Sequence, residues 1–324
     1  WIYLGWKHGF EDAGHDFFEL TAADVNWREA IDRARPDILF CQNLVDLERH
    51  APDLLWAREY GIRVFLVVHW PMPAADVAIM REHDVGDVYF GEREPESMTA
   101  FVQATGRTYT LISNAADSRL HHPVAPVAKY ACDIAFVGSR MRTKRWFNVL
   151  LAELRRTYDV RVYGPGWTWQ DRVARVASSG LRNAAPGMAD WVNRRRVVLP
   201  AEDEAALYSS AKICLNFHEQ VPGHVIVNQR AFKLAACGGF QIADDVPAIR
   251  RYFGDDIVMA GLDPDDWLDK INYYMFHGSE RRDLQAFASR RAQAEHLSTH
   301  RVAQVMELAG IRKAQRPPLQ GAYR

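Results

Sequence analysis

The regular alternation of short apolar runs with helical stretches is the feature that most restricts what this chain can fold into. In the first third of the chain, apolar runs occur at 16–20, 37–41, 63–69, 87–90 and 109–113. Stretches with helical character lie between them, such as 53–60 and 95–102. Strands that alternate with helices pair in parallel through right-handed crossovers. The run Val64–Val68 is apolar throughout, which predicts a central strand covered on both faces.

A proline-rich stretch without periodicity, at 114–130, separates this series from a second one. The second series has candidate strands at 133–137, 159–163, 196–199, 212–217 and 240–243. Asp263 and Pro264 predict the start of a helix, and 279–308 is expected to be mostly helical. A chain of 324 residues is long enough for two domains of about 150 residues each. We therefore predict an α/β fold with two αβα domains, 1–120 and 121–324, facing a central cleft.

The charge balance and the lack of long apolar runs argue against several classes of protein. Lys plus Arg is 40 and Asp plus Glu is 41, a net charge of −1, whereas a dedicated nucleic-acid binder carries a large basic excess. No apolar run approaches the roughly 20 residues that a membrane span needs. Four separated cysteines without a Cys-x-x-Cys pair predict buried, reduced thiols in a cytoplasmic protein. Because residue 1 is Trp and not Met, the natural chain is expected to begin earlier.

One segment of the second series combines a strand end, a helix start and several cations. Gly138–Arg145 follows a predicted strand and opens a predicted helix. Its cationic residues are Arg140, Arg142, Lys144 and Arg145. A helix N-terminus offers free N–H groups and a partial positive charge to an anion such as phosphate. The alternative is a solvated surface loop, and the strand–loop–helix context favours the anion site.

A second segment, Asn228–Gly239, has small residues that let a helix approach the sheet closely and end at glycine. Asn228, Arg230 and Lys233 lie on its first turns, near the carboxyl end of the strand at 212–217. Spacing alone favours a core helix with three polar surface residues over a binding site.

Three stretches of the second half, Lys212–His218, Asn228–Gly238 and Phe240–Asp244, resemble the CgeB-like (spore maturation protein) glycosyltransferases. These are related to the large group of GT-B glycosyltransferases, which use nucleotide sugars. Shorter matches occur at Gly14–Asp16, Asn114–Asp117, Phe136–Gly138, Val162–Trp167 and Phe253–Ile257. The resemblance implies two Rossmann-like domains, an acceptor domain and then a donor domain, with a C-terminal helix that crosses back. It also implies that a first strand before Trp1 is missing.

The resemblance implies a nucleotide-diphosphate sugar as co-substrate and no cofactor. Lys144 matches the family's diphosphate-binding lysine. The other cations expected at the diphosphate are Arg140, Arg142 and Arg230. Ser139 stands beside Gly138 where the family usually has arginine, and both are expected to line the donor site.

The same resemblance assigns the sugar and nucleotide contacts. Lys233 stands at the position of the family's glutamate that binds the nucleotide ribose. A lysine cannot accept the ribose hydrogen bonds as a carboxylate does, and Lys233 is expected to contact a phosphate or hydroxyl of the donor instead. The partner carboxylate of the motif falls near Val225, which is not acidic, so His224, Asn228 or Arg230 is expected to take over donor contacts. The loop whose backbone often contacts the base is matched by Leu199 and Pro200.

His69 is the candidate catalytic residue. In related enzymes a histidine at the end of the matching strand points into the cleft and touches the donor sugar; the alternative is a histidine that only caps the sheet. His8 and Trp70 are expected to contact the acceptor. The other histidines are not at metal-ligand spacing, and because GT-B enzymes generally need no bound metal, none is predicted.

These expectations describe a glycosyltransferase that moves a sugar from a nucleotide-diphosphate sugar to an unidentified acceptor. A glycan or a small molecule is favoured over nucleic acid as that acceptor. The related enzymes imply metal-independent transfer with retention of configuration. Two alternatives stay open: a nucleotide-sugar epimerase of the same fold, and a catalytically inert nucleotide- or sugar-binding protein, which Lys233 makes plausible.

Overall fold

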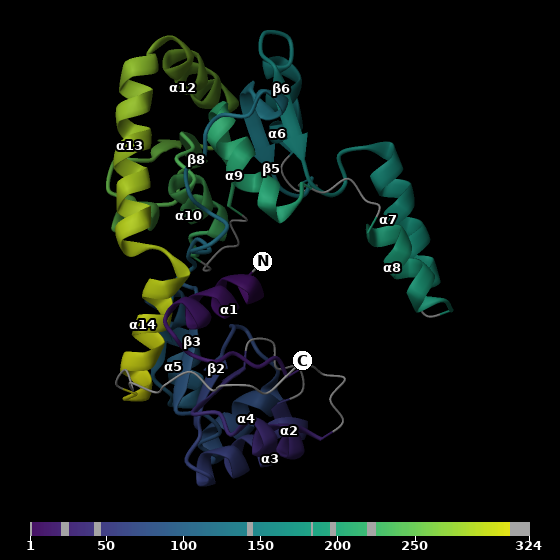
Figure 1. The fold of residues 1–324 in the computed structure, drawn as a ribbon, viewed down its shortest axis with the longest axis vertical. Helices are drawn as coiled ribbons and strands as arrows, with labels where there is room; N and C mark the ends of the chain where they lie inside the picture. Colours follow the sequence, from purple (N-terminus) through teal and green to yellow (C-terminus); the bar gives the residue numbers. More distant parts are fainter. Residues whose placement is uncertain are drawn as a thin grey trace. The chain divides into compact units, whose positions relative to one another are not determined.

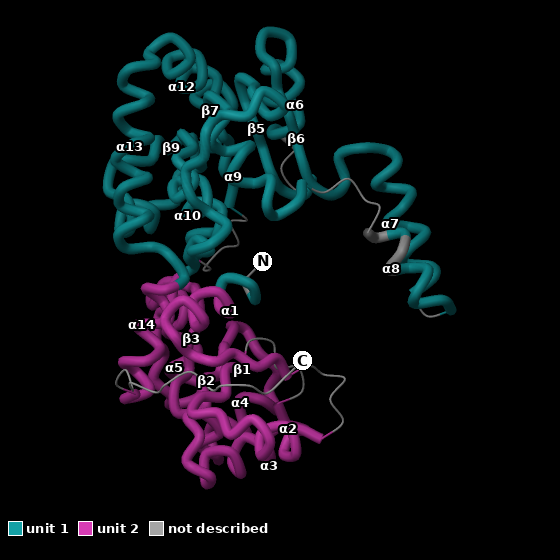
Figure 2. The backbone as a smooth tube through the Cα atoms, viewed as in Figure 1, with its two compact units in different colours: residues 1–5, 114–222, 226–298 teal, residues 6–113, 223–225, 299–324 magenta. Residues whose placement is uncertain are grey.

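The computed structural model describes residues 2–20, 26–41, 47–140, 145–182, 184–194, 199–218 and 225–311. The chain divides into two compact units (Figure 2). Unit 1 comprises residues 1–5, 114–222 and 226–298, and unit 2 comprises residues 6–113, 223–225 and 299–324. The main division, at 113/114, falls at the start of the proline-rich stretch, whereas the sequence analysis placed it after residue 120. Each unit contains one parallel sheet, which confirms the α/β prediction.

Unit 2 is built on a four-stranded parallel sheet in the order β1-β2-β3-β4 (Figure 1). Its strands are β1 (Ile38–Cys41), β2 (Arg63–Val67), β3 (Val88–Gly91) and β4 (Tyr109–Leu111). Its helical elements are α1 (Ile2–Asp12, which begins in unit 1), α2 (Trp27–Ala34), α3 (Leu47–Glu59), α4 (Ala74–Glu82), η1 (Pro95–Met98), α5 (Thr99–Thr105) and α14 (Ser298–Ala309).

Strand β2 is the centre of this unit, as its apolar run predicts. Val64 and Leu66 pack into a cluster with residues of α2, α3, α4 and α5. Phe65 points to the opposite face, where it packs with Phe10 of α1 and with Val305 of α14. The alternation buries both faces of the strand. The C-terminal helix α14 therefore returns to the first sheet, which confirms the predicted crossing back.

The predicted strand at 16–20 is wrong. Residues 15–20 form neither a strand nor a helix, and no described strand pairs with them. The Phe17 ring instead packs on Phe10 of α1, with 5.9 Å between ring centroids. An extended segment needs the hydrogen bonds of a neighbouring strand to become part of a sheet, and an apolar run alone does not supply them.

Unit 1 has a five-stranded parallel sheet in the order β6-β5-β7-β8-β9 (Figure 1). Its strands are β5 (Cys132–Val137), β6 (Val160–Tyr163), β7 (Ala211–Asn216), β8 (Gln241–Asp244) and β9 (Val258–Ala260). Its helices are η2 (Ala128–Tyr130), α6 (Arg145–Leu154), α7 (Trp169–Leu181), α8 (Pro186–Arg194), α9 (Ala201–Ser210), α10 (Gln229–Ala236), α11 (Ile249–Phe253), α12 (Pro264–Phe276) and α13 (Gly278–Glu295). The predicted strand at 196–199 lies outside the described residues except for Leu199.

Aromatic side chains form the core on the face of this sheet that α6 and α12 cover. Phe217 stacks on the fully buried Trp267 with 4.4 Å between ring centroids, and Phe147 lies 4.1 Å from Phe217. Asp263 caps α12 by accepting a hydrogen bond from a backbone amide, and Pro264 is the first helical residue, as predicted. Helices α9 and α10 cover the other face, where Leu207 and Leu234 are buried.

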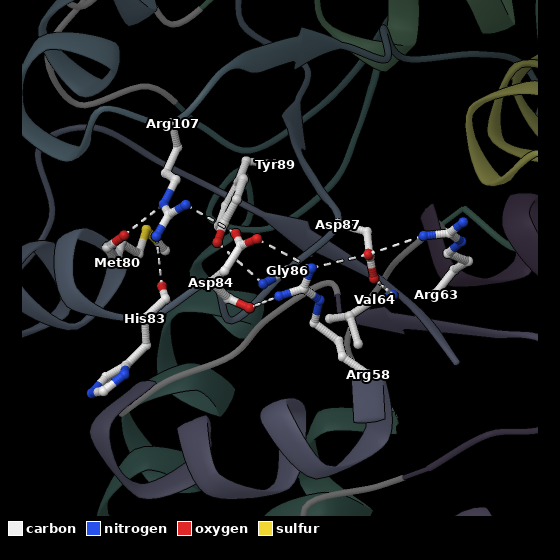
Figure 3. Close-up of polar contacts among 10 residues, drawn as sticks. All are labelled: Arg58, Arg63, Val64, Met80, His83, Asp84, Gly86, Asp87, Tyr89 and Arg107. Atoms are coloured by element: carbon white, nitrogen blue, oxygen red, sulfur yellow. Dashed lines mark hydrogen bonds and ion pairs between the residues drawn. The ribbon is translucent and has the colours of Figure 1, made fainter. Parts of the chain in front are cut away.

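A network of charged residues fastens the amino-terminal edge of the sheet in unit 2 (Figure 3). Asp87, just before β3, accepts a hydrogen bond from the Val64 amide of β2 at 2.8 Å. Arg58 and Arg63 donate to its other oxygen at 3.2 and 3.3 Å. Ligands of such sheets bind at the opposite, carboxyl edge, so we interpret this network as structural.

Arg107 extends the network to α4. Its guanidinium donates to the Asp84 carboxylate at 3.0 Å and to the carbonyls of Met80 and His83 at 2.6 and 2.9 Å (Figure 3). It also lies over the Tyr89 ring, 5.9 Å from the centroid. One side chain thus holds the end of α4 against β3.

We predict that Asp87→Asn destabilises unit 2 by about 2 kcal/mol, because it leaves two guanidinium groups without their shared charge. Hydrogen exchange in peptides covering β2 and β3 should then be roughly thirtyfold faster. Burial tends to raise the pKa of Asp87, but the Val64 amide and Arg58 outweigh burial and lower it. The wild-type advantage is therefore complete above about pH 4 and is lost as the pH falls through the folded pKa. Glu29→Gln, at an exposed ion pair, is the control and should change exchange little.

Candidate functional site

The loop that follows β5 is held tightly against the loop that follows β6. The amide of Gly138 donates to the Tyr163 carbonyl at 2.8 Å, and the amide of Arg140 donates to the Pro165 carbonyl at 2.9 Å. Gly164 has a φ of +128°, and a Cβ there would lie 2.4 Å from the Gly138 carbonyl oxygen. No side chain fits so small a gap, so this approach of two backbones requires glycine.

Trp167 fixes the same turn from the other side. Its indole Nε1 donates to the Gly138 carbonyl at 2.7 Å. Its ring packs edge-on against Phe136 and Phe147, with 5.9 Å between ring centroids in each pair. The backbone of Gly138 therefore has a defined position at the carboxyl end of β5, the edge where ligands of such sheets bind.

Arg230 of α10 reaches this turn. A Cβ at Gly138 would lie only 2.6 Å from its Nη2, so the glycine makes room for the guanidinium. The guanidinium carbon lies over the Phe136 ring, 5.1 Å from the centroid. Its Nη1 donates to the side-chain oxygen of Asn216 and to the carbonyl of Phe217, each at 3.3 Å. The side chain is thus fixed at the carboxyl ends of β5 and β7.

The hydrogen-bond partners of Arg230 do not neutralise its charge. Both acceptors are neutral oxygens, and among the described residues no carboxylate lies within ion-pair distance of it. Burial lowers the pKa of Arg230, although Glu204 and Asp244 oppose the shift from beyond ion-pair distance, and a guanidinium stays charged in proteins. A half-buried cation without a carboxylate in direct contact is a favourable place for an anion.

Asn228 organises the end of β7 and the start of α10. Its side-chain oxygen accepts from the Ala231 amide at 3.0 Å, which caps the helix. Its side-chain nitrogen donates to Asn216 at 2.9 Å and to the Phe217 carbonyl at 3.0 Å. Asn228 and Arg230 therefore share two acceptors. The sequence analysis did not single out Asn216; a polar residue closing a buried strand was the available signal.

His218 and Asp244 form a second pair that the sequence analysis did not assign to the site. The amide and the Nδ1 of His218 both lie against one oxygen of Asp244, at 2.8 and 2.7 Å. Both residues are buried, at the carboxyl ends of the neighbouring strands β7 and β8. Their signal in the sequence is a polar residue at the end of each buried strand.

Lys233 points into the interior of unit 1. It is 6% exposed, and its ammonium group lies 3.1 Å from the Glu204 carboxylate of α9. The same oxygen of Glu204 lies 3.1 Å from the His121 Nε2. The His121 Nδ1 accepts from the Asp117 amide at 2.9 Å, which makes Nε2 the protonated nitrogen of a neutral ring. The predicted contact between Lys233 and a donor stays a prediction.

Charge and burial set the protonation states of this cluster. Burial, followed by the positive charge of Lys233, lowers the pKa of His121 although Glu204 opposes the shift. Burial tends to raise the pKa of Glu204, but His121 and Lys233 outweigh burial and lower it. At neutral pH the cluster is therefore an ion pair with a neutral imidazole.

Two of the remaining predicted residues lie at the carboxyl edge of the sheet in unit 2. His69 is exposed just beyond β2, and Trp70 is half-buried and packs edge-on against Phe101. Desolvation of the ring, followed by the charge of Arg93, lowers the pKa of His69. Glu92 follows the neighbouring strand β3, and burial raises the pKa of its carboxyl although Arg93 opposes the shift. Glu92 was not anticipated from the sequence.

The predicted donor residues divide into three groups. Gly138, Asn228 and Arg230 lie together at the edge described above, and the exposed Ser139 and Arg140 continue the same loop. Leu199 is buried in the core and Pro200 directly precedes α9. Residues outside the described ranges are Arg142, Lys144 and His224. His8 is half-buried on α1 of unit 2.

The described residues show neither a metal centre nor a bilayer-spanning helix. Across residues 2–311 with their gaps, His, Cys, Asp and Glu nowhere form a group of three that could hold a metal ion. In the same residues no helix is long and apolar enough to cross a membrane.

We predict that Lys233→Glu lowers the stability of unit 1 by about 3 kcal/mol or more, because it buries a second carboxylate beside Glu204. Adding Glu204→Lys should recover part of this loss by restoring an ion pair of opposite orientation. Thermal unfolding followed by circular dichroism measures both effects. Lys129→Glu, at an exposed position, is the control for the charge change. Equal unfolding temperatures for Lys233→Glu and the control would show that the pair is not structural.

Solved structures with similar folds are glycosyltransferases and related enzymes. Sucrose-phosphate synthase from Thermosynechococcus elongatus is 15% identical, with a TM-score of 0.56 over 87% of this chain and 75% of that one. HepE from Anabaena, in complex with UDP and glucose, is 12% identical, with a TM-score of 0.55 over 87% and 80%. The N-terminal domain of trehalose-6-phosphate phosphatase from Candida albicans is 12% identical, with a TM-score of 0.55 over 94% and 78%.

These likenesses establish the GT-B fold, with its two Rossmann-like domains. A search of the curated proteins finds no match. A family model described as glycosyl transferase-like matches residues 142–307. This stretch is more than half of the chain and contains Arg230, the ion pair of Lys233 and the strands β6 to β9. The chain therefore belongs to the glycosyl transferase-like family.

Proposed function

We propose that this glycosyltransferase transfers a sugar from a nucleotide-diphosphate sugar, and that unit 1 binds this donor. The observation that carries the proposal is Arg230, a fixed guanidinium that only neutral oxygens hold at the Gly138 turn. The diphosphate of a sugar donor supplies the missing negative charge. The carboxyl edge of a parallel sheet is also the usual place for a nucleotide in such folds.

The diphosphate is the group that most needs protein contacts during the reaction. When the bond between the anomeric carbon and the phosphate oxygen breaks, the electron pair leaves with the phosphate. Fixed cations and backbone N–H groups stabilise that developing charge. We assign this role to Arg230 and to the loop cations Arg140, Arg142 and Lys144, in keeping with the CgeB-like resemblance.

UDP is the first nucleotide to test, because the similar structure of HepE contains UDP and glucose. We assign the base contacts to the backbone of Leu199 and Pro200. Asn228 and His224 are the proposed contacts to the sugar or ribose. We expect Lys233 to influence the donor site through Glu204, because its ammonium group lies against that carboxylate in the interior of unit 1.

We assign to His69 either the positioning of the donor sugar or help in moving the acceptor proton, and to His8 and Trp70 contacts with the acceptor. The proposed reaction retains the anomeric configuration and needs no bound metal. The acceptor oxygen bonds to the anomeric carbon while the phosphate departs, and the acceptor proton passes to a phosphate oxygen. An epimerase is not favoured by the match to a glycosyltransferase family.

The decisive experiment incubates the protein with a panel of nucleotide sugars, with and without candidate glycan and small-molecule acceptors. Release of free nucleoside diphosphate together with a glycosylated product supports the proposal. Conversion of one nucleotide sugar into its epimer would support the epimerase instead. Tight binding without turnover over the whole panel would indicate an inert nucleotide-binding protein.

We predict that Arg230→Gln weakens UDP binding and slows turnover at least tenfold, equivalent to about 1.4 kcal/mol. Arg230→Lys keeps the charge but loses the planar guanidinium with its paired N–H donors. Its UDP affinity and turnover should lie between those of Arg230→Gln and the wild type. Calorimetry with UDP and the rate of diphosphate release measure the two effects. Arg155→Gln removes a cation from an exposed position of the same unit and should behave like wild type. Wild-type UDP affinity in a folded Arg230→Gln protein would remove Arg230 from the site.

We predict that His69→Ala retains UDP affinity but loses transfer at least tenfold. Because the pKa of His69 is lowered, its ring should be neutral at pH 7 and become charged only below the ordinary value of about 6.5. Wild-type turnover should therefore fall when the pH is lowered below that value, and the turnover of the variant should not show this fall. His83→Ala, at an exposed ring of the same unit, is the control. Normal transfer by His69→Ala would exclude a role in the reaction and would show that His69 only caps the sheet.

A further inference from the structure

Helix α7 carries an apolar stripe on its exposed side. Trp169, Val173 and Val176 follow one another at helical spacing and are 65%, 56% and 69% exposed. On the opposite side of the helix, Asp171 and Ser178 are buried, at 3% and 4%. Two polar side chains thus face inward while the large apolar ones face outward, whereas an ordinary surface helix turns its apolar stripe toward the core.

The exposed stripe belongs to a helical hairpin. Helices α7 and α8 pack against each other (Figure 1). On α8, Met188 is 57% exposed while Ala189 is buried. The hairpin therefore buries Asp171, Ser178 and Ala189 and leaves a tryptophan, two valines and a methionine exposed. Apolar side chains gathered in this way mark an interaction surface more often than scattered ones do.

The hairpin has a basic excess. Residues 168–194 contain the four arginines 172, 175, 182 and 194, against the aspartates 171 and 190. This segment has a net charge of +2 (4 − 2), so the rest of the chain, with a total of −1, has −3. Arg172 and Arg175 are exposed and lie beside the apolar stripe on α7.

The start of the hairpin is fixed to the Gly138 turn. Thr168 caps α7 by accepting from the Asp171 amide at 3.1 Å, and the Asp171 carboxylate accepts from the Gly166 amide. The Arg140 amide in turn donates to the Pro165 carbonyl at 2.9 Å. A surface that holds the hairpin therefore also fixes the position of the proposed donor loop.

We propose that the α7–α8 hairpin binds the surface of an anionic lipid bilayer. Tryptophan and aliphatic side chains on one helix face, flanked by arginines, are the pattern of helices that lie in the interface plane of a membrane. The apolar stripe enters the boundary between headgroups and acyl chains. The arginines contact lipid phosphates, whose negative charge complements the +2 of the segment.

A second copy of the chain is the less suitable occupant. Two hairpins related by symmetry would bring like charges of +2 together, which opposes association unless counter-ions intervene. An anionic bilayer has no such conflict. The proposal concerns where the enzyme works and is independent of the donor that it uses.

The test is co-sedimentation of the whole chain with vesicles. Vesicles of phosphatidylcholine mixed with phosphatidylglycerol should sediment the wild-type protein at least tenfold more efficiently than vesicles of phosphatidylcholine alone. High salt should weaken the interaction, because it screens the arginines. Equal sedimentation with neutral and anionic vesicles, or none with either, overturns the proposal.

Two pairs of variants separate the apolar and the cationic contributions. Trp169→Ser should lower binding to anionic vesicles at least fivefold, whereas Phe276→Ser, at an 84% exposed phenylalanine of α12, should not. Arg172→Glu with Arg175→Glu should abolish binding, whereas Arg155→Glu with Arg156→Glu makes the same charge change elsewhere on unit 1 and should retain most of it. Unchanged circular dichroism shows that each variant is folded.

Light scattering without lipid tests the competing occupant. The wild-type protein and Trp169→Ser should have the same molar mass in solution. A dimer that Trp169→Ser dissociates would assign the stripe to a second copy and overturn the proposal. UDP affinity should be equal in all hairpin variants, so that loss of vesicle binding is distinguished from damage to the donor site.

Discussion

The contact between Gly138 and Gly164 is the constraint on which the ligand-facing edge of unit 1 depends. Two backbones meet there with no room for a Cβ, since one at Gly164 would lie 2.4 Å from a carbonyl oxygen. The same turn leaves space for the Arg230 guanidinium and presents a carbonyl to Trp167. A Cβ at Gly138 would collide with the Arg230 guanidinium, and a Cβ at Gly164 would push the two backbones apart in the loop that leads to α7. Sequence requirements at two small residues thus control a binding edge and a surface hairpin.

Two cations of α10 show how the surroundings of a charge decide what it can do. Lys233 is matched by Glu204 at 3.1 Å, so its charge is used within the fold. Arg230, three positions earlier, is held by neutral oxygens of Asn216 and Phe217. The lysine replaces the glutamate that the family resemblance leads one to expect, and α9 supplies a carboxylate beside it. The charge reversal therefore has a local structural explanation and does not by itself argue for an inert protein.

Periodicity in the sequence was sufficient to predict the strands of the two sheets but not the contacts within the candidate site. Apolar runs located eight of the nine strands in the described residues, because burial on both faces of a parallel sheet leaves a strong local signal. The apolar run at 16–20 led to a wrong strand prediction, because a strand also needs a neighbouring strand to pair with, and a local sequence pattern does not show whether one is present. Asn216, His218, Asp244 and Glu204 were missed as partners for the same reason: each is defined by a contact with a residue 12 or more positions away. The position of Gly138 at a strand end was predictable, whereas its closeness to Arg230 was not.

The neutral partners of Arg230 are what allow it to serve a transient anion. A carboxylate at the position of Asn216 would hold the guanidinium more strongly, but it would also compete with phosphate for the same N–H groups. Amide and carbonyl oxygens orient the planar group and leave its charge available. The phenyl ring of Phe136 adds an apolar wall at 5.1 Å, which keeps water from one face and strengthens the field on the other. The cation is therefore already in place before the charge of a departing diphosphate develops, which is the arrangement that lowers the cost of reorganisation during the reaction.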